Sequence, residues 1–158
     1  MAWRLFLSLA LGAACAAGVG CAGEYGDGHS EAAVISSRST WRITGDLQSV
    51  VSAIDQNPGT AAVSAAPDGR GTITIDLGKP CLFNMVVIEH GSNEMGFARR
   101  VAVLTSLDGE IFTQRYVGVG TRRVTILYMG TPVLARYVRL RAIVAGEQPW
   151  SVAEVYLQ

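Results

Sequence analysis

Apolar and polar residues alternate along much of the chain from residue 38 onward. In "TITIDL" (72–77), the apolar residues share one face of an extended chain, and the Thr and Asp residues share the other. The same period of two recurs in "YVRLRA" (137–142) and in "VAEVYL" (152–157). Strands with one apolar and one polar face are typical of antiparallel sheets that cover a core on one side.

Other segments add further short strands. "NMVVIEHG" (84–91) is a nearly continuous apolar run, which indicates a strand covered on both faces. "RVAVLTSLDG" (100–109) ends in Asp-Gly, a signal for a β-hairpin turn. "IFTQRYVG", "RRVTILYMG" and "ARYVRLRAIV" follow, each bounded by Gly or Pro. No segment in this region repeats apolar residues at helical spacing over three turns. The pattern therefore predicts an all-β protein, an antiparallel β-sandwich over residues 38–158.

The first 22 residues have a different pattern. They carry one positive charge near the start (Arg4), continue as an apolar run and end in small residues. This is the layout of a secretory signal peptide (1–22). A retained membrane anchor is the alternative, although the run is short for a membrane span. The "GVGC" that ends at Cys21 is similar to the lipobox of bacterial lipoproteins, with Gly18 where Leu is usual. We expect a secreted, periplasmic or cell-surface protein, either released or lipid-anchored at Cys21.

Composition narrows the remaining possibilities. Residues 23–37 are rich in Gly, Ser and acidic residues without periodicity, and this indicates a flexible linker. The formal net charge of the 158-residue chain is zero, so the basic surplus of a nucleic-acid-binding protein is missing. Cys15 and Cys21 lie in the leader, which leaves Cys81 without a partner for a disulfide. We expect Cys81 to be a small buried hydrophobic residue.

Six short motifs occur in one order between residues 53 and 157: "AIDQNPGT", "ITIDLGKP", "VVIEHG", "TSLDGEIFT", "ARYVRLRA" and "WSVAEVYL". This set resembles the discoidin domain, also called the factor V/VIII (F5/8) type C domain, of the galactose-binding-like superfamily. The resemblance implies an eight-stranded jelly-roll sandwich. Two departures matter. Ala62 replaces the usual Trp of a T-x-W motif, which removes a bulky packing group near the turn at 52–60. The cysteines that join the chain ends in animal members are missing, which points to a bacterial, carbohydrate-binding-module type.

The turn "SAIDQNPGT" (52–60) gathers a carboxylate, an amide and a hydroxyl around a Pro-Gly pair. These groups either bond to the backbone of their own turn or surround a hard cation such as calcium. The resemblance favours calcium, because many family members hold a structural Ca²⁺ between this loop and a Glu that begins the last strand. Gln56 stands where Gly is usual. The matching ligand positions are the Ala53 backbone carbonyl, Asp55, Asn57, Thr60 and Glu154.

Jelly-roll modules of this kind bind ligands with loops at one end of the sandwich. A sugar site needs an aromatic face for the ring and polar groups for its hydroxyls. "EHGSNEMGFARR" (89–100) and "GEQPWS" (146–151) contain both kinds of side chain. The alternative is that the histidine bonds to a local carbonyl and that the aromatic rings cover the core. The candidate carbohydrate-binding residues are His90, Asn93, Glu94, Phe97, Arg99, Arg100 and Trp150.

Catalytic motifs are missing from the sequence. One of its two histidines lies in the linker, and no Ser/His/Asp set, Cys/His set or phosphate-binding glycine loop is recognisable. We therefore expect an exported, non-catalytic module that binds a glycan or cell-surface polysaccharide and holds a structural calcium ion. The alternative is a protein-interaction or scaffold domain of the cell surface that lacks a sugar site. Membrane contact is expected only through the lipid anchor, and nucleic acid is not expected as a partner.

Overall fold

The computed structural model describes residues 33–158. The expected signal peptide, Cys21 and the first part of the expected linker lie outside the described residues. The domain begins to make contacts before Arg38, because Ile35 packs against the core. The Ser36 hydroxyl donates a hydrogen bond to the Leu77 carbonyl, with an O–O distance of 2.6 Å. The last residues of the expected linker are therefore part of the folded domain.

The described chain is built from β-strands, which confirms the predicted fold class. Two short 3-10 helices, η1 and η2, are its defined helical elements. Within the described residues, no helix has the length and apolar character needed to cross a membrane. The elements in chain order are η1 (Arg38–Thr40), β1 (Arg42–Gly45), β2 (Leu47–Gln48), η2 (Val50–Ala53), β3 (Ala62–Ser64), β4 (Thr72–Glu89), β5 (Arg100–Ser106), β6 (Thr113–Val119), β7 (Val124–Val144), β8 (Ser151–Val152) and β9 (Glu154–Leu157).

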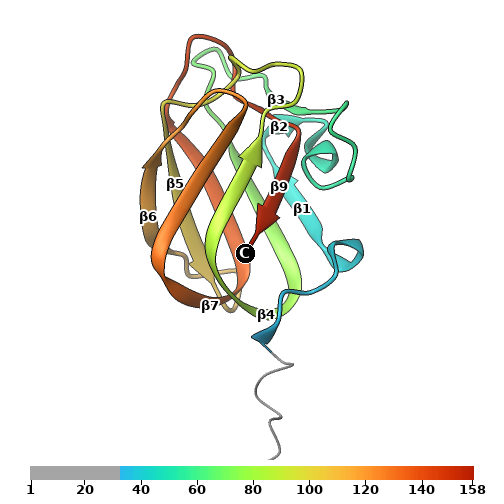
Figure 1. Ribbon diagram of the computed structural model, residues 1–158, viewed down its shortest axis with the longest axis vertical. Helices are drawn as coiled ribbons and strands as arrows, with labels where there is room; N and C mark the ends of the chain where they lie inside the picture. The colour runs from blue at the N-terminus through green and yellow to red at the C-terminus, as the bar shows by residue number, and fades with distance from the viewer. Residues whose placement is uncertain (1–32) are drawn as a thin grey trace, which may run out of the picture.

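Strands β4 and β7 are much longer than the sequence pattern predicts. "TITIDL" and "NMVVIEHG", expected as separate strands, are the two halves of β4, and β7 likewise joins two predicted strands. Both long strands bend where the sequence reads Gly-x-Pro, at Gly78 and at Gly130, and both glycines have positive φ angles (79° and 81°). Figure 1 shows the two strands curving together at the end of the molecule near the N-terminal segment.

The bends divide the long strands between two packed layers. In one layer, residues 72–76 of β4 lie between β1 and the second half of β7, which also pairs with β5, and β6 follows at the edge. In the other layer, residues 86–89 of β4 lie between β9 and the first half of β7. A small separate sheet, in the order β2-β3-β8, lies beside them. This arrangement is the predicted antiparallel β-sandwich (Figure 1).

The core lies between the layers and contains the apolar set of each alternating strand. Cys81 is fully buried in this core, as predicted, and Trp41, which is 6% exposed, also joins it. Many outward positions of the same strands are polar, as is usual in a two-layer sandwich, although Ile126 and Tyr128 of β7 are exposed apolar or aromatic residues. Apolar residues with no exposed surface include Ile73, Ile75, Leu77, Val86, Ile88, Val138, Leu140 and Val155.

Candidate functional site

Four loops gather at the end of the sandwich opposite the strand bends (Figure 1). They are residues 65–71, 90–99, 120–123 and 145–150, which connect successive strands. Backbone hydrogen bonds join the loops to one another. The Trp150 N–H donates to the Gly69 carbonyl at 3.0 Å, and the His90 N–H donates to the Arg123 carbonyl at 2.9 Å. The sandwich therefore presents one joined loop surface, as expected for a ligand-binding end.

His90 lies beneath this surface and not on it. The side chain is 1% exposed, and its Nδ1 lies 2.6 Å from the Ser151 carbonyl, which can only accept a hydrogen bond. The neutral ring therefore carries its proton on Nδ1, and Nε2 accepts from the Thr125 hydroxyl at 2.9 Å. Burial lowers the pKa of His90, and the bond to Ser151 opposes this shift only in part. The prediction that His90 contacts a sugar is therefore wrong, because both of its ring nitrogens are bonded inside the protein.

Trp150 is also placed differently from the sequence prediction. Its ring is fully buried within the hydrophobic core, and its indole N–H has no hydrogen-bond partner among the described residues. A ring without exposed surface has no face to offer a sugar. The alternative stated for this residue, a ring that covers the core, is what the structure shows. A sequence pattern cannot reveal which side of a loop faces inward, and this is why the two alternatives could not be separated.

The other candidates of the 89–100 loop are at least partly accessible. Glu94 is held by two arginines, Arg123 at 2.6 Å and Arg122 at 3.2 Å, and Arg123 makes the largest contribution to its lowered pKa. Arg99 makes a loose, exposed pair with Glu147 at 3.5 Å. Within residues 33–158, the candidates of this loop that keep accessible surface and make no ion pair are Asn93, Phe97 and Arg100.

The turn that was expected to bind calcium is folded around Asp55. The Asp55 Oδ1 accepts the Asn57 N–H at 2.9 Å, and Oδ2 accepts the Thr60 hydroxyl at 2.7 Å. The side-chain oxygen of Asn57 accepts the Gly59 N–H at 3.0 Å. The Thr60 hydroxyl and then the Asn57 N–H lower the pKa of Asp55. The alternative of a self-capped turn is therefore present in the structure, and Asp55 itself remains exposed.

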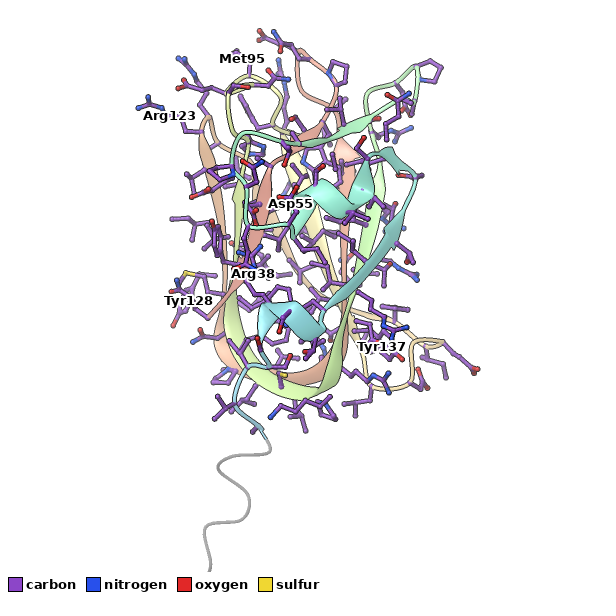
Figure 2. The ribbon with its side chains drawn as sticks, turned by 90° about the vertical axis from the view of Figure 1, so that its right-hand side faces the viewer. Arg38, Asp55, Met95, Arg123, Tyr128 and Tyr137 are labelled. Atoms are coloured by element: carbon purple, nitrogen blue, oxygen red, sulfur yellow. The ribbon has the colours of Figure 1, made fainter. Side chains whose placement is uncertain are left out.

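Glu154 lies beside this turn at the start of β9, and it adds a smaller contribution to the lowered pKa of Asp55. It is fully buried, its Oε2 accepts a bond from the Arg38 guanidinium, and its Oε1 has no partner within the described residues. Arg38 also lies over the ring of Tyr156, 4.7 Å from its centroid. Figure 2 shows Arg38 and Asp55 on the same side of the molecule, with Asp55 above.

The oxygen atoms of the Asp55 turn and of Glu154 can be compared with the ligands that calcium requires. Carboxylate and hydroxyl oxygens of Asp55, Thr60 and Glu154 are hard donors, and the unpartnered Oε1 of Glu154 is free to bind a cation. The donor set therefore fits calcium in its chemistry. Two carboxylates alone do not form a complete site, and across residues 33–158 no group of three or more His, Cys, Asp or Glu side chains is arranged for a metal. Arg38, which the sequence analysis did not identify, already supplies a positive charge to Glu154.

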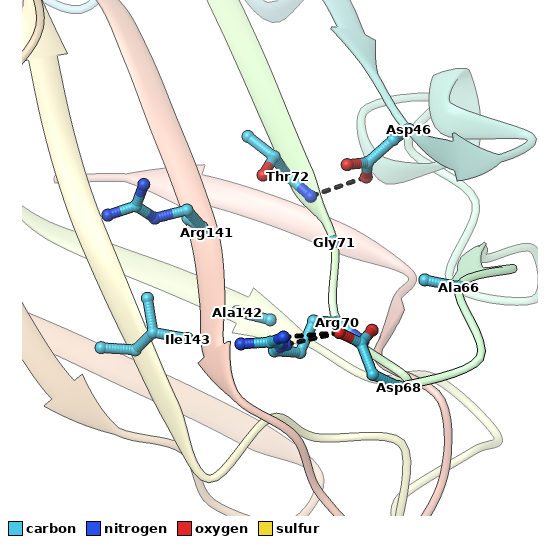
Figure 3. A pocket seen from close by; sticks show the side chains of 9 residues that line it. All are labelled: Asp46, Ala66, Asp68, Arg70, Gly71, Thr72, Arg141, Ala142 and Ile143. Carbon is cyan, nitrogen blue, oxygen red and sulfur yellow. Dashed lines mark hydrogen bonds and ion pairs between the residues drawn. The ribbon is translucent and has the colours of Figure 1, made fainter.

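The sequence analysis also missed a polar groove of about 400 Å³ beside the β3–β4 loop. The Asp46 Oδ1 accepts the Thr72 N–H at 2.7 Å, and Asp68 binds the Arg70 side chain at 2.7 Å. Figure 3 shows Asp46 and the Asp68–Arg70 pair from different elements, with Gly71 and the start of β4 between them. The signal in the sequence was "APDGRG" (66–71), an acid and a base on a glycine-rich turn. The charged and hydroxyl residues of this groove, called the loop-end groove below, are Asp46, Asp68, Arg70, Thr72 and Arg141.

Together these features describe a jelly-roll β-sandwich that presents loops and a polar groove at one end. The chain belongs to the F5/8 type C domain family, which it matches over residues 31–155. This is the discoidin family that the sequence motifs indicate. Membership of this family is consistent with the predicted non-catalytic module.

Solved structures share the fold at low sequence identity. The fifth family 32 CBM (carbohydrate-binding module) of GH89 from Clostridium perfringens, in complex with GalNAc-β-1,3-galactose, aligns with a TM-score of 0.68 and 19% identity over 76% of this chain and 96% of that chain. The family 32 CBM of C. perfringens NanJ, in complex with galactose, gives 0.65 and 18% over 76% and 94%. CBM32-3 from a C. perfringens family 31 glycoside hydrolase gives 0.64 and 23% over 81% and 95%. The comparison with curated proteins finds no match.

Proposed function

We propose that this domain binds carbohydrate at its loop end and that its partner is a glycan or cell-surface polysaccharide. The observation that supports this most directly is the loop-end groove. Carboxylates accept hydrogen bonds from sugar hydroxyls and guanidinium groups donate to them, and the groove holds both kinds of group in one concavity. The galactose and GalNAc-β-1,3-galactose bound to two structural neighbours support the same ligand class.

The 89–100 loop has a secondary part in this proposal. Asn93, Phe97 and Arg100 keep exposed surface at the same end of the molecule and extend the surface available to a longer glycan. Glu94 and Arg99 pair with other charged residues, as Asp68 and Arg70 of the loop-end groove pair with one another, so a ligand would use their remaining donor and acceptor positions. His90 and Trp150 support the loops from beneath.

The test is retention of the domain on immobilised galactose, GalNAc and their β-1,3-linked disaccharide. We expect Arg70→Ala and Asp68→Ala to weaken retention at least tenfold, because each removes a charge-assisted hydrogen bond. Phe97→Ala is the matched control in the neighbouring loop and is expected to keep most of the binding. Binding that depends on Phe97 and not on Arg70 would move the site to the 89–100 loop. If none of the immobilised sugars retains the domain, the proposal is wrong.

A structural calcium ion is part of the proposal. Asp55, Thr60 and Glu154 would hold it with their side-chain oxygens, and the Ala53 and Asn57 positions would add neutral oxygens. The ion would supply a divalent charge that links the first turn to the last strand. The unpartnered oxygen of Glu154 supports this role, and Arg38 competes for the same carboxylate. With two carboxylates, we expect a weak affinity, about 10⁻⁴ to 10⁻³ M, as in other extracellular modules.

Export completes the proposal, and it is supported by the sequence of residues 1–22. The mature domain would be secreted, periplasmic or on the cell surface, with or without acyl chains on Cys21. Mass spectrometry of the protein from its host membrane and medium fractions distinguishes the two forms. A full-length protein that retains Met1 in the cytoplasm would refute export.

A second function, protein interaction at the cell surface, is favoured by one observation. Ile126 and Tyr128 on β7 are 58% and 56% exposed, and their side chains project from the same face of one strand. A scaffold domain without a sugar site would use such a surface. Loss of partner capture in an Ile126→Ser, Tyr128→Ser double variant, combined with no retention on the sugar panel, would favour this alternative.

A further inference from the structure

The outer face of the layer formed by β1, β4 and β7 has an ordered set of polar side chains. Strand pairing places Arg42 opposite Asp76 and Asp76 opposite Tyr137. The next outward row runs from Thr44 through Thr74 to Arg139. Since side chains alternate between the faces of a strand, both rows point away from the core.

These two rows form a second groove of about 330 Å³, called the strand-face groove below. Its walls include Arg42 on β1 and Gly109 of the β5–β6 turn, and its floor includes Thr74 and Asp76. The loop-end groove lies directly beyond it, because Thr72 and Arg141 are the next outward residues on the same two strands. In Figure 2, Tyr137 marks the end of this face near the strand bends. The two grooves thus follow one another along β4 and β7.

The carboxylates on this face already have partners. Asp76 accepts two bonds from Arg136, at 2.8 and 3.0 Å, and one from the Gly78 N–H at 2.8 Å. Arg136 accordingly makes the largest contribution to the lowered pKa of Asp76. In the loop-end groove, Asp46 and Asp68 are bonded to Thr72 and Arg70. Asp76 and Asp68 are thus paired with arginines, whereas Asp46, at the loop end, accepts only a backbone N–H and makes no ion pair within the described residues.

Three arginines of the same face lack a carboxylate in direct contact. The side chains of Arg42 and Arg141 make no hydrogen bond or ion pair within the described part of the chain, although Arg42 contributes a small, more distant effect on the pKa of Asp76. Arg139 donates to the Thr74 hydroxyl at 3.0 Å, and its guanidinium lies 3.6 Å from the centroid of the Phe112 ring. Although the formal charge of the whole chain is zero, these three groups form a local positive strip.

We propose that the strand-face groove binds the acidic groups, carboxylate or sulfate, of a polysaccharide that extends from the loop-end groove along β4 and β7. This inference rests on the proposed carbohydrate binding and specifies an acidic glycan. Strands are about 4.8 Å apart and same-face residues about 7 Å apart along a strand, so Arg42, Arg139 and Arg141 span several sugar units and not one small anion. Guanidinium groups suit this role, because they bind planar acidic groups with two parallel hydrogen bonds.

The aromatic rings on this face favour an acidic glycan over single-stranded nucleic acid. Nucleic-acid strands are bound by stacking bases on exposed rings. Here Arg139 covers Phe112, and Arg136 lies over Tyr137, 4.9 Å from its centroid. Gly109 also packs against the Tyr137 ring. Since both rings are in use, charge is what the groove offers to a ligand.

The experiment measures binding of the full domain to polygalacturonate, to its fully methyl-esterified form and to dextran sulfate, at low and high salt. We expect the polyanions to bind, the neutral ester to bind at least tenfold more weakly, and added salt to weaken binding to the polyanions. Preference for polygalacturonate over dextran sulfate assigns the groove to carboxylates, and the reverse assigns it to sulfates. An oligothymidylate that binds as tightly as the polyanions would overturn the choice of a glycan.

Variants locate the site. We expect Arg42→Gln with Arg139→Gln to weaken polygalacturonate binding about tenfold or more, and Arg139→Lys, which keeps the charge, to lose less. Arg122→Gln with Arg123→Gln removes the same charge from the β6–β7 turn and is expected to leave binding unchanged. Since Arg42 is exposed, the single Arg42→Gln variant keeps the test valid if the double variant does not fold. Equal losses of polygalacturonate binding in the two double variants would show that the strand-face groove is not the binding site.

Neutral sugars separate this inference from the proposed function. If the domain retains galactose or GalNAc but does not distinguish polygalacturonate from its ester, the acidic groove is wrong and the proposed function stands. If neither the neutral sugars nor the polyanions bind, carbohydrate binding itself is refuted.

Discussion

At the residue scale, Arg38 and Glu154 show how the first described residues are joined to the last strand. We expect Arg38→Ala to lower the free energy of unfolding by about 3–5 kcal/mol, because the Glu154 carboxylate is fully buried and would lose its counter-charge. Urea denaturation measures this loss. Millimolar calcium should restore part of it, since an ion at Asp55 and Glu154 would replace the missing charge.

The double variant Arg38→Ala, Glu154→Gln is the control for this prediction. It removes the buried charge together with its partner, so it should be more stable than Arg38→Ala alone and should not respond to calcium. If chelator and added calcium leave both the wild type and Arg38→Ala unchanged, the calcium part of the proposed function is refuted. The same outcome would leave Arg38 as the cation that Glu154 needs.

His90 makes stability depend on pH at the same scale. Burial lowers its pKa in the folded state, so the unfolded chain binds a proton at a higher pH than the folded domain does. The contribution of His90 to stability is therefore fully present above its pKa in the unfolded chain, about 6.5. This contribution is lost as the pH falls through the lower pKa of the folded state. We expect the free energy of unfolding, measured by urea denaturation at a series of pH values, to decrease as the pH falls from about 7 to about 5.

His90→Gln tests this assignment, because a neutral amide keeps hydrogen-bonding capacity without titrating. The variant should lose the pH dependence between pH 7 and pH 5. Carboxylates with lowered pKa values, such as Asp108 at about 2, give a separate loss of stability only at more acidic pH. The Ser106 hydroxyl makes the largest contribution to the lowered pKa of Asp108. A pH dependence that persists in His90→Gln would assign the effect to another group.

At the scale of elements, the alternation of apolar and polar residues was enough to predict the strands but not their continuity. Gly78 and Gly130 interrupt the pattern, and a pattern read residue by residue treats an interruption as the end of a strand. In the structure each interruption is a bend within a continuous strand. Gly78 lies in the register shift between Asp76 and Cys81, and Gly130 lies opposite the second shift, between Phe83 and Met85. The strand-face groove could not be predicted for a related reason: its rows need the register between β1, β4 and β7.

The two bends can be tested by adding one methyl group at each. Gly78 and Gly130 have positive φ angles, which cost an L-residue about 1–2 kcal/mol. A Cβ at Gly130 would contact nothing within 4 Å, and at Gly78 it would meet only ordinary contacts with Thr40. We expect each Gly→Ala variant to lose about that much stability in chemical denaturation, from backbone strain alone.

The asparagine variants are the matched control, because Asn tolerates positive φ better than Ala does. Gly78→Asn and Gly130→Asn should therefore be more stable than the alanine variants, although their side chains are larger. If the asparagine variants were the less stable pair, crowding and not backbone conformation would be the cause.

At the scale of the whole molecule, one core must hold both layers and the loop end together. Cys81 is the sole cysteine of residues 33–158 and is free, so no disulfide assists within this part of the chain. Trp150 connects core and loops: its ring is buried in the hydrophobic core, while its backbone bonds to Gly69 and Ser64. Removal of the ring should therefore affect the entire domain and not only a local surface.

We expect Trp150→Ala to lower the free energy of unfolding by about 3–5 kcal/mol, as for other large rings removed from a core. Since small domains have about 5–15 kcal/mol in total, this variant will be partly unfolded under mild denaturing conditions. Trp150→Phe keeps most of the buried volume and should lose much less stability while it retains full glycan binding. A ring that stacks on sugar predicts the opposite result: Trp150→Ala would remain stable and lose its ligand. Parallel measurements of unfolding and glycan retention on both variants distinguish a core residue from a binding platform.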